Sequence, residues 1–218
     1  MQKLQSVTAI VIAALFFLCA AFAEELPQWE GYGITELNGN VPEIDESLYP
    51  EEPGVIFTML DELGRPGPAY ARLHKSIFPT APRSPLYGFT PAGYQNTMYD
   101  FIPGGYLYNR SHLIGNLFCG IDELENLFTG TQLINHESMY QIEQSLYFYL
   151  DLTGNTVLYS VRPAYIGDNL VPSGVYLDAY SIEDNGIGFS RCCYLHNVQP
   201  GVMINYADGT SCLAPVTQ

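Results

Sequence analysis

The sequence predicts an α+β fold in which a helix packs against an antiparallel sheet. Proline-rich loops precede one segment with helical spacing, and segments of alternating apolar residues fill the final third of the chain. The resulting order of strand, loop, helix and then sheet is typical of α+β domains.

The helix is predicted from His136 to Leu150. Its apolar residues share one face, and Thr153-Gly154-Asn155 ends it; they are Met139, Ile142, Leu146, Tyr149 and Leu150. Upstream, Tyr106 to Arg110 is predicted to be a strand that delivers His112 to its end, and Gly54 to Thr58 a short strand. Six prolines between Pro66 and Gly93 predict an irregular loop.

Four later segments are predicted to form an antiparallel meander. The dipeptide Asn185-Gly186 is a strong hairpin turn, Gln199-Pro200-Gly201 is a further turn, and Asp208-Gly209 closes the meander. The four strands are expected at Thr156 to Val161, Gly174 to Ile182, Ile187 to Leu195 and Val202 to Tyr206.

Residues 1–23 have the composition of a signal peptide. Lys3 gives a cationic start, Val7 to Phe22 is almost unbroken apolar, and Ala21-Phe22-Ala23 is a small-x-small cleavage signal. The mature chain is therefore expected to begin near Glu24 and to be exported. Without cleavage, the same segment would be an N-terminal membrane anchor.

The mature chain is predicted to be an acidic arm, residues 24–53, followed by one domain, residues 54–218. It contains four cysteines: Cys119, Cys192, Cys193 and Cys212. An oxidising compartment leaves three pairings open, of which a bridge from Cys192 or Cys193 to Cys212 is favoured. No C-x-x-C pair exists, and adjacent strand residues point to opposite faces, which argues against a zinc site.

The net charge of −15 argues at first against a nucleic-acid partner, which usually requires a basic surface. The basic residues are unevenly distributed, however. Five of the seven Lys and Arg beyond residue 23 lie between Gly64 and His112, where Asp100 is the only acidic residue. This window predicts a positive field beside His112, although chance clustering on a solvated surface would give the same pattern.

His112 is a candidate general base because an ordinary histidine has a pKa near 6.5 and can accept a proton at neutral pH. Asn135 and Glu143 lie eight residues apart and reach the same half of a helix. One amide oxygen can be enough for a hydrated Mg²⁺ ion, and a carboxylate within an apolar stripe needs a partner. The structural alternatives are a strand-end histidine, a helix N-cap at Asn135 and a turn residue at Asn126.

These residues carry a specific resemblance. Tyr108-Asn109-Arg110-Ser111-His112-Leu113-Ile114-Gly115, then Asn126-Leu127-Phe128-Thr129-Gly130-Thr131, then Asn135 and Glu143, resemble the DNA/RNA non-specific endonucleases of the ββα-metal (His-Me finger) superfamily, especially secreted and DNA-entry nucleases of bacteria. The similarity covers roughly residues 54 to 209. It implies a ββα-metal core in the sheet fold and a DNA and/or RNA substrate.

The resemblance also implies roles. His112 would be the general base, Asn135 the direct ligand of Mg²⁺, for which Mn²⁺ is a possible substitute, and Glu143 a group that binds the metal's water shell. Asn126 would hold the site or the phosphate, and Arg110 would bind phosphate or support the structure. The family usually has Asp and Gly beside that arginine, where this chain has Asn109 and Ser111. That departure puts in doubt how His112 is supported.

A different class of protein is a secreted binding domain with the nuclease fold but little or no activity, whose tyrosines would line a surface for polysaccharide or protein. Retention of His112, Asn135 and Glu143 together favours the enzyme. A serine or cysteine hydrolase is less well supported, because no G-x-S-x-G motif occurs.

Overall fold

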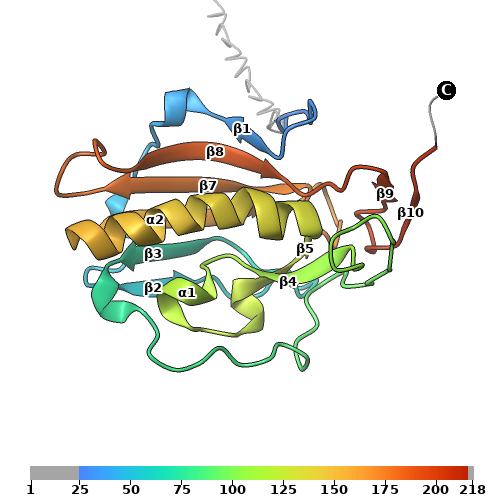
Figure 1. Cartoon of the computed structure of the whole chain (residues 1–218), viewed down its shortest axis with the longest axis horizontal. Coiled ribbons are helices and arrows are strands. Elements are labelled where there is room, and N and C mark those ends of the chain that lie inside the picture. The colour runs from blue at the N-terminus through green and yellow to red at the C-terminus, as the bar shows by residue number, and fades with distance from the viewer. Residues whose placement is uncertain (1–24, 216–218) are drawn as a thin grey trace, which may run out of the picture.

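The computed structural model describes residues 25–215, which form a six-stranded antiparallel sheet, two small β-ribbons and a long helix (Figure 1). The strand order is β1-β8-β7-β6-β3-β2. The strands are β1 (Ile34–Glu36), β2 (Gly54–Phe57), β3 (Ala69–Leu73), β6 (Val157–Ala164), β7 (Gly174–Ser181) and β8 (Ser190–His196). The α+β prediction is confirmed.

The predicted signal peptide at residues 1–23, and the membrane anchor that is its alternative, lie outside the described residues. Between residues 25 and 215, none of the helices combines the length and the apolar character needed to cross a membrane.

The main core lies between the sheet and helix α2 (Tyr140–Thr153), which runs across one face of the sheet (Figure 1). Strand residues alternate between faces, so every second residue of β6 enters this core: Val157, Tyr159 and Val161. The helix contributes residues one turn apart, among them Leu146 and Leu150, which are fully buried. Burial of each such aliphatic side chain stabilises the fold by about 1.5–3 kcal/mol.

The site is built on a second, smaller unit. Strands β4 (Tyr108–His112) and β5 (Leu127–Thr131) pair antiparallel, and a π-helical turn, η5 (Ile134–Met139), follows and continues into α2. The connection between the strands holds the short helix α1 (Asn116–Cys119) and the 3-10 turn η4 (Leu124–Asn126). Two strands and a helix in this order form the expected ββα unit (Figure 1).

Residues 25–53 extend the sheet at one edge and cover part of its second face. Strand β1 pairs with β8, and Leu26 and Leu37 pack against a cluster that includes Tyr176 and Tyr194 on that face. Two 3-10 turns, η1 (Asn38–Asn40) and η2 (Glu46–Leu48), complete this segment, and a third, η3 (Lys75–Ile77), follows β3. The acidic segment therefore contributes an edge strand and part of a core.

Five strands differ from the sequence-based expectation, and the first is β1, which lies in the segment predicted to be an acidic arm. β3 lies inside the segment predicted to be an irregular loop, because the prolines of that segment flank the strand without entering it. β5 has no alternating pattern to reveal it, since all five of its residues are buried. The prediction of a fourth meander strand is wrong, because β9 (Val202–Ile204) pairs with β10 (Ser211–Leu213) in a separate ribbon.

The departure of the chain from the main sheet has a clear cause. After β8, the Asn197 side chain accepts a hydrogen bond from the Thr131 backbone N–H (2.8 Å) and donates to the carbonyls of Thr129 and Pro172 (both 2.9 Å). These bonds direct the chain to β5, and Val202 and Ile204 then pack on a small cluster around Leu107.

The other predicted boundaries shift by a few residues. β4 begins two residues later than expected and ends at His112, while α2 begins at Tyr140, after the π-helical turn. The hairpin turn is confirmed, because Asn185 and Gly186 both have positive φ (56° and 77°). The first three meander strands, β6, β7 and β8, are also confirmed.

The expected bridge from Cys192 or Cys193 to Cys212 is not formed. All four cysteines within residues 25–215 are free. Cys193 is buried against the core in β8, whereas Cys212 is exposed on β10, in the ribbon beyond the end of the main sheet (Figure 1).

Candidate active site

A pocket of about 310 Å³ lies between the end of β4, the α1 connection and the start of the long helix. His112, Asn135 and Glu143 all line it. The structure therefore brings together three of the five predicted site residues. Arg83 and Asn116, which no prediction assigned to the site, line the same pocket.

His112 is the last residue of β4 and is 8% exposed. Its Nε2 atom lies 2.8 Å from Oδ1 of Asp122, which also accepts a hydrogen bond from Asn116 Nδ2 (3.1 Å). When Nε2 donates to the carboxylate, Nδ1 is the ring nitrogen that can accept a proton.

Burial lowers the pKa of His112, and the charge of Arg83 lowers it further, while the hydrogen bond to Asp122 and the charge of Asp122 oppose the shift. The imidazole is therefore neutral at pH 7. A neutral, oriented imidazole in a pocket has the properties of a general base.

Asp122, like Arg83, is a residue of the site region that sequence reasoning did not assign. It lies in the connection between β4 and β5, together with Glu123 and Glu125. The acidic residues of that connection were the only available signal, and the choice among them depends on how the connection folds. Asn109, whose departure from the family pattern put the support of His112 in doubt, bonds instead to Gln132 (2.9 Å).

Glu143 projects from α2 into the pocket and is buried. Burial raises its pKa to about 8, although hydrogen bonding by the Gly115 backbone and the charge of Arg83 lower it in part. Its Oε1 atom has no hydrogen-bond partner among the described residues. A buried carboxylate oxygen without a partner is costly unless a cation or water satisfies it.

Gly115 allows the Glu143 carboxyl group to lie against the backbone. A Cβ atom built on Gly115 would be 2.6 Å from Oε1 of Glu143. Only a residue without a side chain leaves space for the carboxyl group at this point.

Asn135 lies within the π-helical turn and is half-buried. It is not an N-cap, because the Thr131 hydroxyl accepts the hydrogen bond from the Ile134 backbone N–H (3.2 Å). Within residues 25–215, the Asn135 side chain makes no hydrogen bond, so its amide oxygen is available in the pocket. π-helical turns are frequent at functional sites, where they re-aim side chains.

Asn126 and Arg110 lie elsewhere. Asn126 is fully buried and its side chain is satisfied by Ile114 and Ile121: it accepts from Ile114 N (2.8 Å) and donates to Ile114 O (3.0 Å) and Ile121 O (2.9 Å). It therefore holds the connection that carries Asp122, and is not available to a phosphate. Arg110 lines a neighbouring pocket, where it donates to Phe89 O (2.6 Å).

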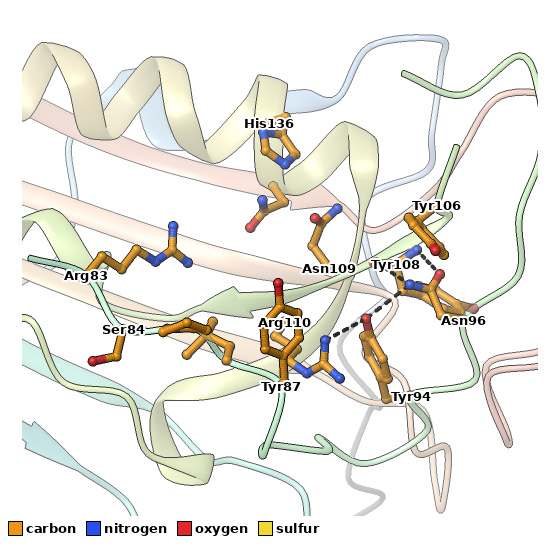
Figure 2. A pocket seen from close by; sticks show the side chains of 13 residues that line it. Arg83, Ser84, Tyr87, Tyr94, Asn96, Tyr106, Tyr108, Asn109, Arg110 and His136 are labelled. Atoms are coloured by element: carbon orange, nitrogen blue, oxygen red, sulfur yellow. Dashed lines mark hydrogen bonds between the residues drawn. The ribbon is translucent and has the colours of Figure 1, made fainter. Parts of the chain in front are cut away.

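This second pocket has a volume of about 760 Å³ and shares Arg83, Asn135 and His136 with the first (Figure 2). Four tyrosines line it: Tyr87, Tyr94, Tyr106 and Tyr108. The guanidinium of Arg110 stacks over the Tyr94 ring at 4.4 Å from its centroid. The two pockets together make one continuous polar and aromatic surface.

The model of the DNA/RNA non-specific endonuclease family matches residues 48–182, which include every predicted site residue. The chain belongs to this family. A comparison with curated protein sequences finds no match. The fold is similar to that of two crystal structures of NucA from Streptococcus agalactiae, one with no metal bound and one with a magnesium ion bound.

Both NucA structures share 23% sequence identity with this endonuclease, at TM-scores of 0.72 and 0.73; the matches cover 84% of this chain and 87% and 89% of the NucA chains. A structure of Sda1 nuclease with a bound zinc ion has 22% identity and a TM-score of 0.63, over 74% of this chain and 81% of that one. These matches confirm the fold class.

In this endonuclease, the basic window from Gly64 to His112 is largely structural. Arg65 is paired with Asp61, Arg72 donates to Pro50 O, and Lys75 donates to Asp151 O. Arg83 has no hydrogen bond or ion pair within the described residues. The positive field predicted from the whole window is therefore supplied at the site mainly by Arg83.

Proposed function

We propose that this endonuclease is exported and hydrolyses phosphodiester bonds of DNA and/or RNA with a bound divalent cation, leaving products with 5′ phosphates. The observation that carries the proposal is the pocket that His112, which is bonded to Asp122, shares with Asn135 and Glu143. Export is supported by the signal-peptide composition of residues 1–23.

The donor set suits Mg²⁺, with Mn²⁺ as a substitute. Asn135 would hold the cation directly, through an amide oxygen that no protein group uses, and Glu143 would bind its water shell through the unpartnered Oε1 atom. A hydrated Mg²⁺ ion needs only one or two protein ligands beside substrate phosphate. When bound, it supplies Lewis-acid stabilisation of the charge that develops on phosphate oxygens.

The residues of the chain account for the proton transfer. His112 Nδ1 takes a proton from a water molecule, which attacks phosphorus in line with the departing 3′ oxygen. Asp122 holds the ring in the Nε2–H tautomer and stabilises the imidazolium that forms. The guanidinium of Arg83 pairs with phosphate oxygens. A 3′ oxygen as leaving group keeps the phosphate on the 5′ side.

The test is cleavage of plasmid DNA and of RNA by the mature protein in Mg²⁺, with and without chelator. General-base catalysis contributes about 10² to 10⁴ in rate, so His112→Ala should lower kcat by that factor in a protein whose circular dichroism shows that it is still folded. Asn135→Ala should lower activity and raise the Mg²⁺ concentration that gives half-maximal activity. His74→Ala, at η3 and outside both pockets, is the matched control.

Three outcomes would contradict the proposal: no cleavage of either substrate, full activity after removal of all divalent cations, or wild-type rates in His112→Ala. Binding of nucleic acid without cleavage would favour the alternative of an inactive nuclease-fold binding domain.

A further inference from the structure

The larger pocket has no role in the proton-transfer chemistry described above. It adjoins the catalytic pocket through Arg83, Asn135 and His136, so a substrate strand whose phosphate lies at His112 has its neighbouring nucleotide beside this pocket. Its volume of about 760 Å³ is within the range of sites that bind small molecules, which is about 300–1,000 Å³.

Tyr87 is the most exposed aromatic residue of this pocket. It lies on the loop before β4 and is 85% exposed, although its ring borders a pocket (Figure 2). Within residues 25–215, Tyr87 makes no ring contact and no hydrogen bond. Tyr94 differs, because the Arg110 guanidinium covers its ring. Tyr87 therefore keeps its ring available to a ligand.

The polar groups around the ring are largely occupied by the protein itself. Asn96 accepts from Tyr108 N (2.9 Å) and donates to Tyr94 Oη (3.0 Å) and Tyr108 O (2.9 Å). Arg110 is fixed by Phe89 and Tyr94, and Asn109 donates to Gln132. Side chains fixed in this way are poorly placed to read the edge of a base. The pocket thus favours stacking and charge over sequence recognition.

We propose that Tyr87 is a stacking platform for one unpaired nucleobase of the substrate, next to the scissile phosphate held near Arg83. The inference rests on the proposed nuclease function. Every base has an aromatic face, so stacking tolerates any sequence. In a duplex, neighbouring base pairs cover both faces of a base, so stacking on Tyr87 requires a single-stranded or locally opened substrate. The enzyme therefore cleaves single strands more efficiently than duplexes.

The experiment compares kcat/KM for one labelled oligonucleotide, offered as a single strand and as a duplex, in Mg²⁺. Loss of one stacked base corresponds to about 5-fold to 150-fold, so Tyr87→Ala should lower kcat/KM on the single strand by a factor in this range, and by less on the duplex. Tyr87→Phe, which keeps the ring, should recover most of the loss. Tyr32→Ala is the matched control, since Tyr32 is 76% exposed and lies in the N-terminal segment.

A binding measurement separates stacking from catalysis. In His112→Ala, fluorescence anisotropy should show weaker binding of the single strand when Tyr87→Ala is added. If the wild type cleaves both substrates but Tyr87→Ala leaves the ratio of single-strand to duplex kcat/KM and the single-strand affinity unchanged, the stacking proposal is wrong and the nuclease function stands. If the wild type cleaves neither substrate, the proposed function itself fails.

Discussion

Replacement of Asp122 by Asn tests whether the His112–Asp122 pair orients the general base. The substitution keeps the size of the side chain and removes its charge. Asp122 lies 2.8 Å from His112 Nε2, and both side chains are largely buried, at 14% and 7% exposure. Solvent therefore screens the interaction weakly, and the loss of charge should reduce the stabilisation of the charged His112 imidazole.

The magnitude follows from the hydrogen bond. A bond to a charged group contributes about 1.5–3 kcal/mol, which corresponds to about 10- to 150-fold in rate if the bond strengthens as His112 becomes charged. Asn116 still donates to position 122 in the variant, since the amide oxygen can replace Oδ1. We therefore expect a decrease in kcat/KM of this size, with little change in melting temperature.

The pH profile supplies a second readout. Burial lowers the pKa of His112, and Asp122 partly reverses that shift. Because the neutral imidazole is the active form, activity should rise with pH through a pKa below 6.5 and then level off. In Asp122→Asn the pKa should fall further, so the acid limb moves to lower pH while the plateau drops. An unchanged plateau, or an acid limb that moves to higher pH, would refute the proposed role of Asp122.

Two further predictions concern the other charged groups of the pocket. Arg83→Gln should raise KM and reduce the slope of log activity against log salt by about 1, because one phosphate contact is lost. Arg191→Gln, which lies outside both pockets, is the control. Burial raises the pKa of Glu143 from its ordinary value near 4.5 to about 8, so the folded metal-free protein binds this proton more tightly than the unfolded chain. The contribution of protonated Glu143 to the free energy of unfolding is fully present below about pH 4.5 and is lost as pH rises towards 8. Glu143→Gln cannot ionise, so without metal it should melt at a higher temperature than the wild type at pH 8 but not at pH 5. Calorimetry checks this, and equal melting temperatures at pH 8 would contradict the prediction.

The sequence predicted the strands and the helix whose own residues carry a regular spacing of apolar side chains. Every second residue of β6, β7 and β8 faces the core beneath the helix, and this alternation predicted the three strands; helical spacing predicted α2 in the same way. Alternation did not reveal β5, a short strand whose sequence Leu-Phe-Thr-Gly-Thr does not alternate. The sequence also did not predict the pairing of β9, because the hydrogen bonds of Asn197 direct the chain away from the main sheet before this strand begins.

The same distinction applies to the site. His112, Asn135 and Glu143 were predicted together because the ordered motifs that contain them resemble those of the endonuclease family, and these motifs lie on a strand end and a helix. Asp122 and Arg83 lie in irregular segments, where spacing along the chain says little about position in space.

The connection between β4 and β5 explains why the atypical residues Asn109 and Ser111 leave His112 supported. Asn109 bonds to Gln132, and Ser111 is buried opposite Phe128 on β5, so neither bonds to the imidazole. The support comes from Asp122, whose position depends on the fold of residues 113–126. Asn126 closes that connection through three hydrogen bonds to backbone groups at Ile114 and Ile121. We therefore propose that Asn126 is a positioning residue, which acts through the backbone that carries Asp122.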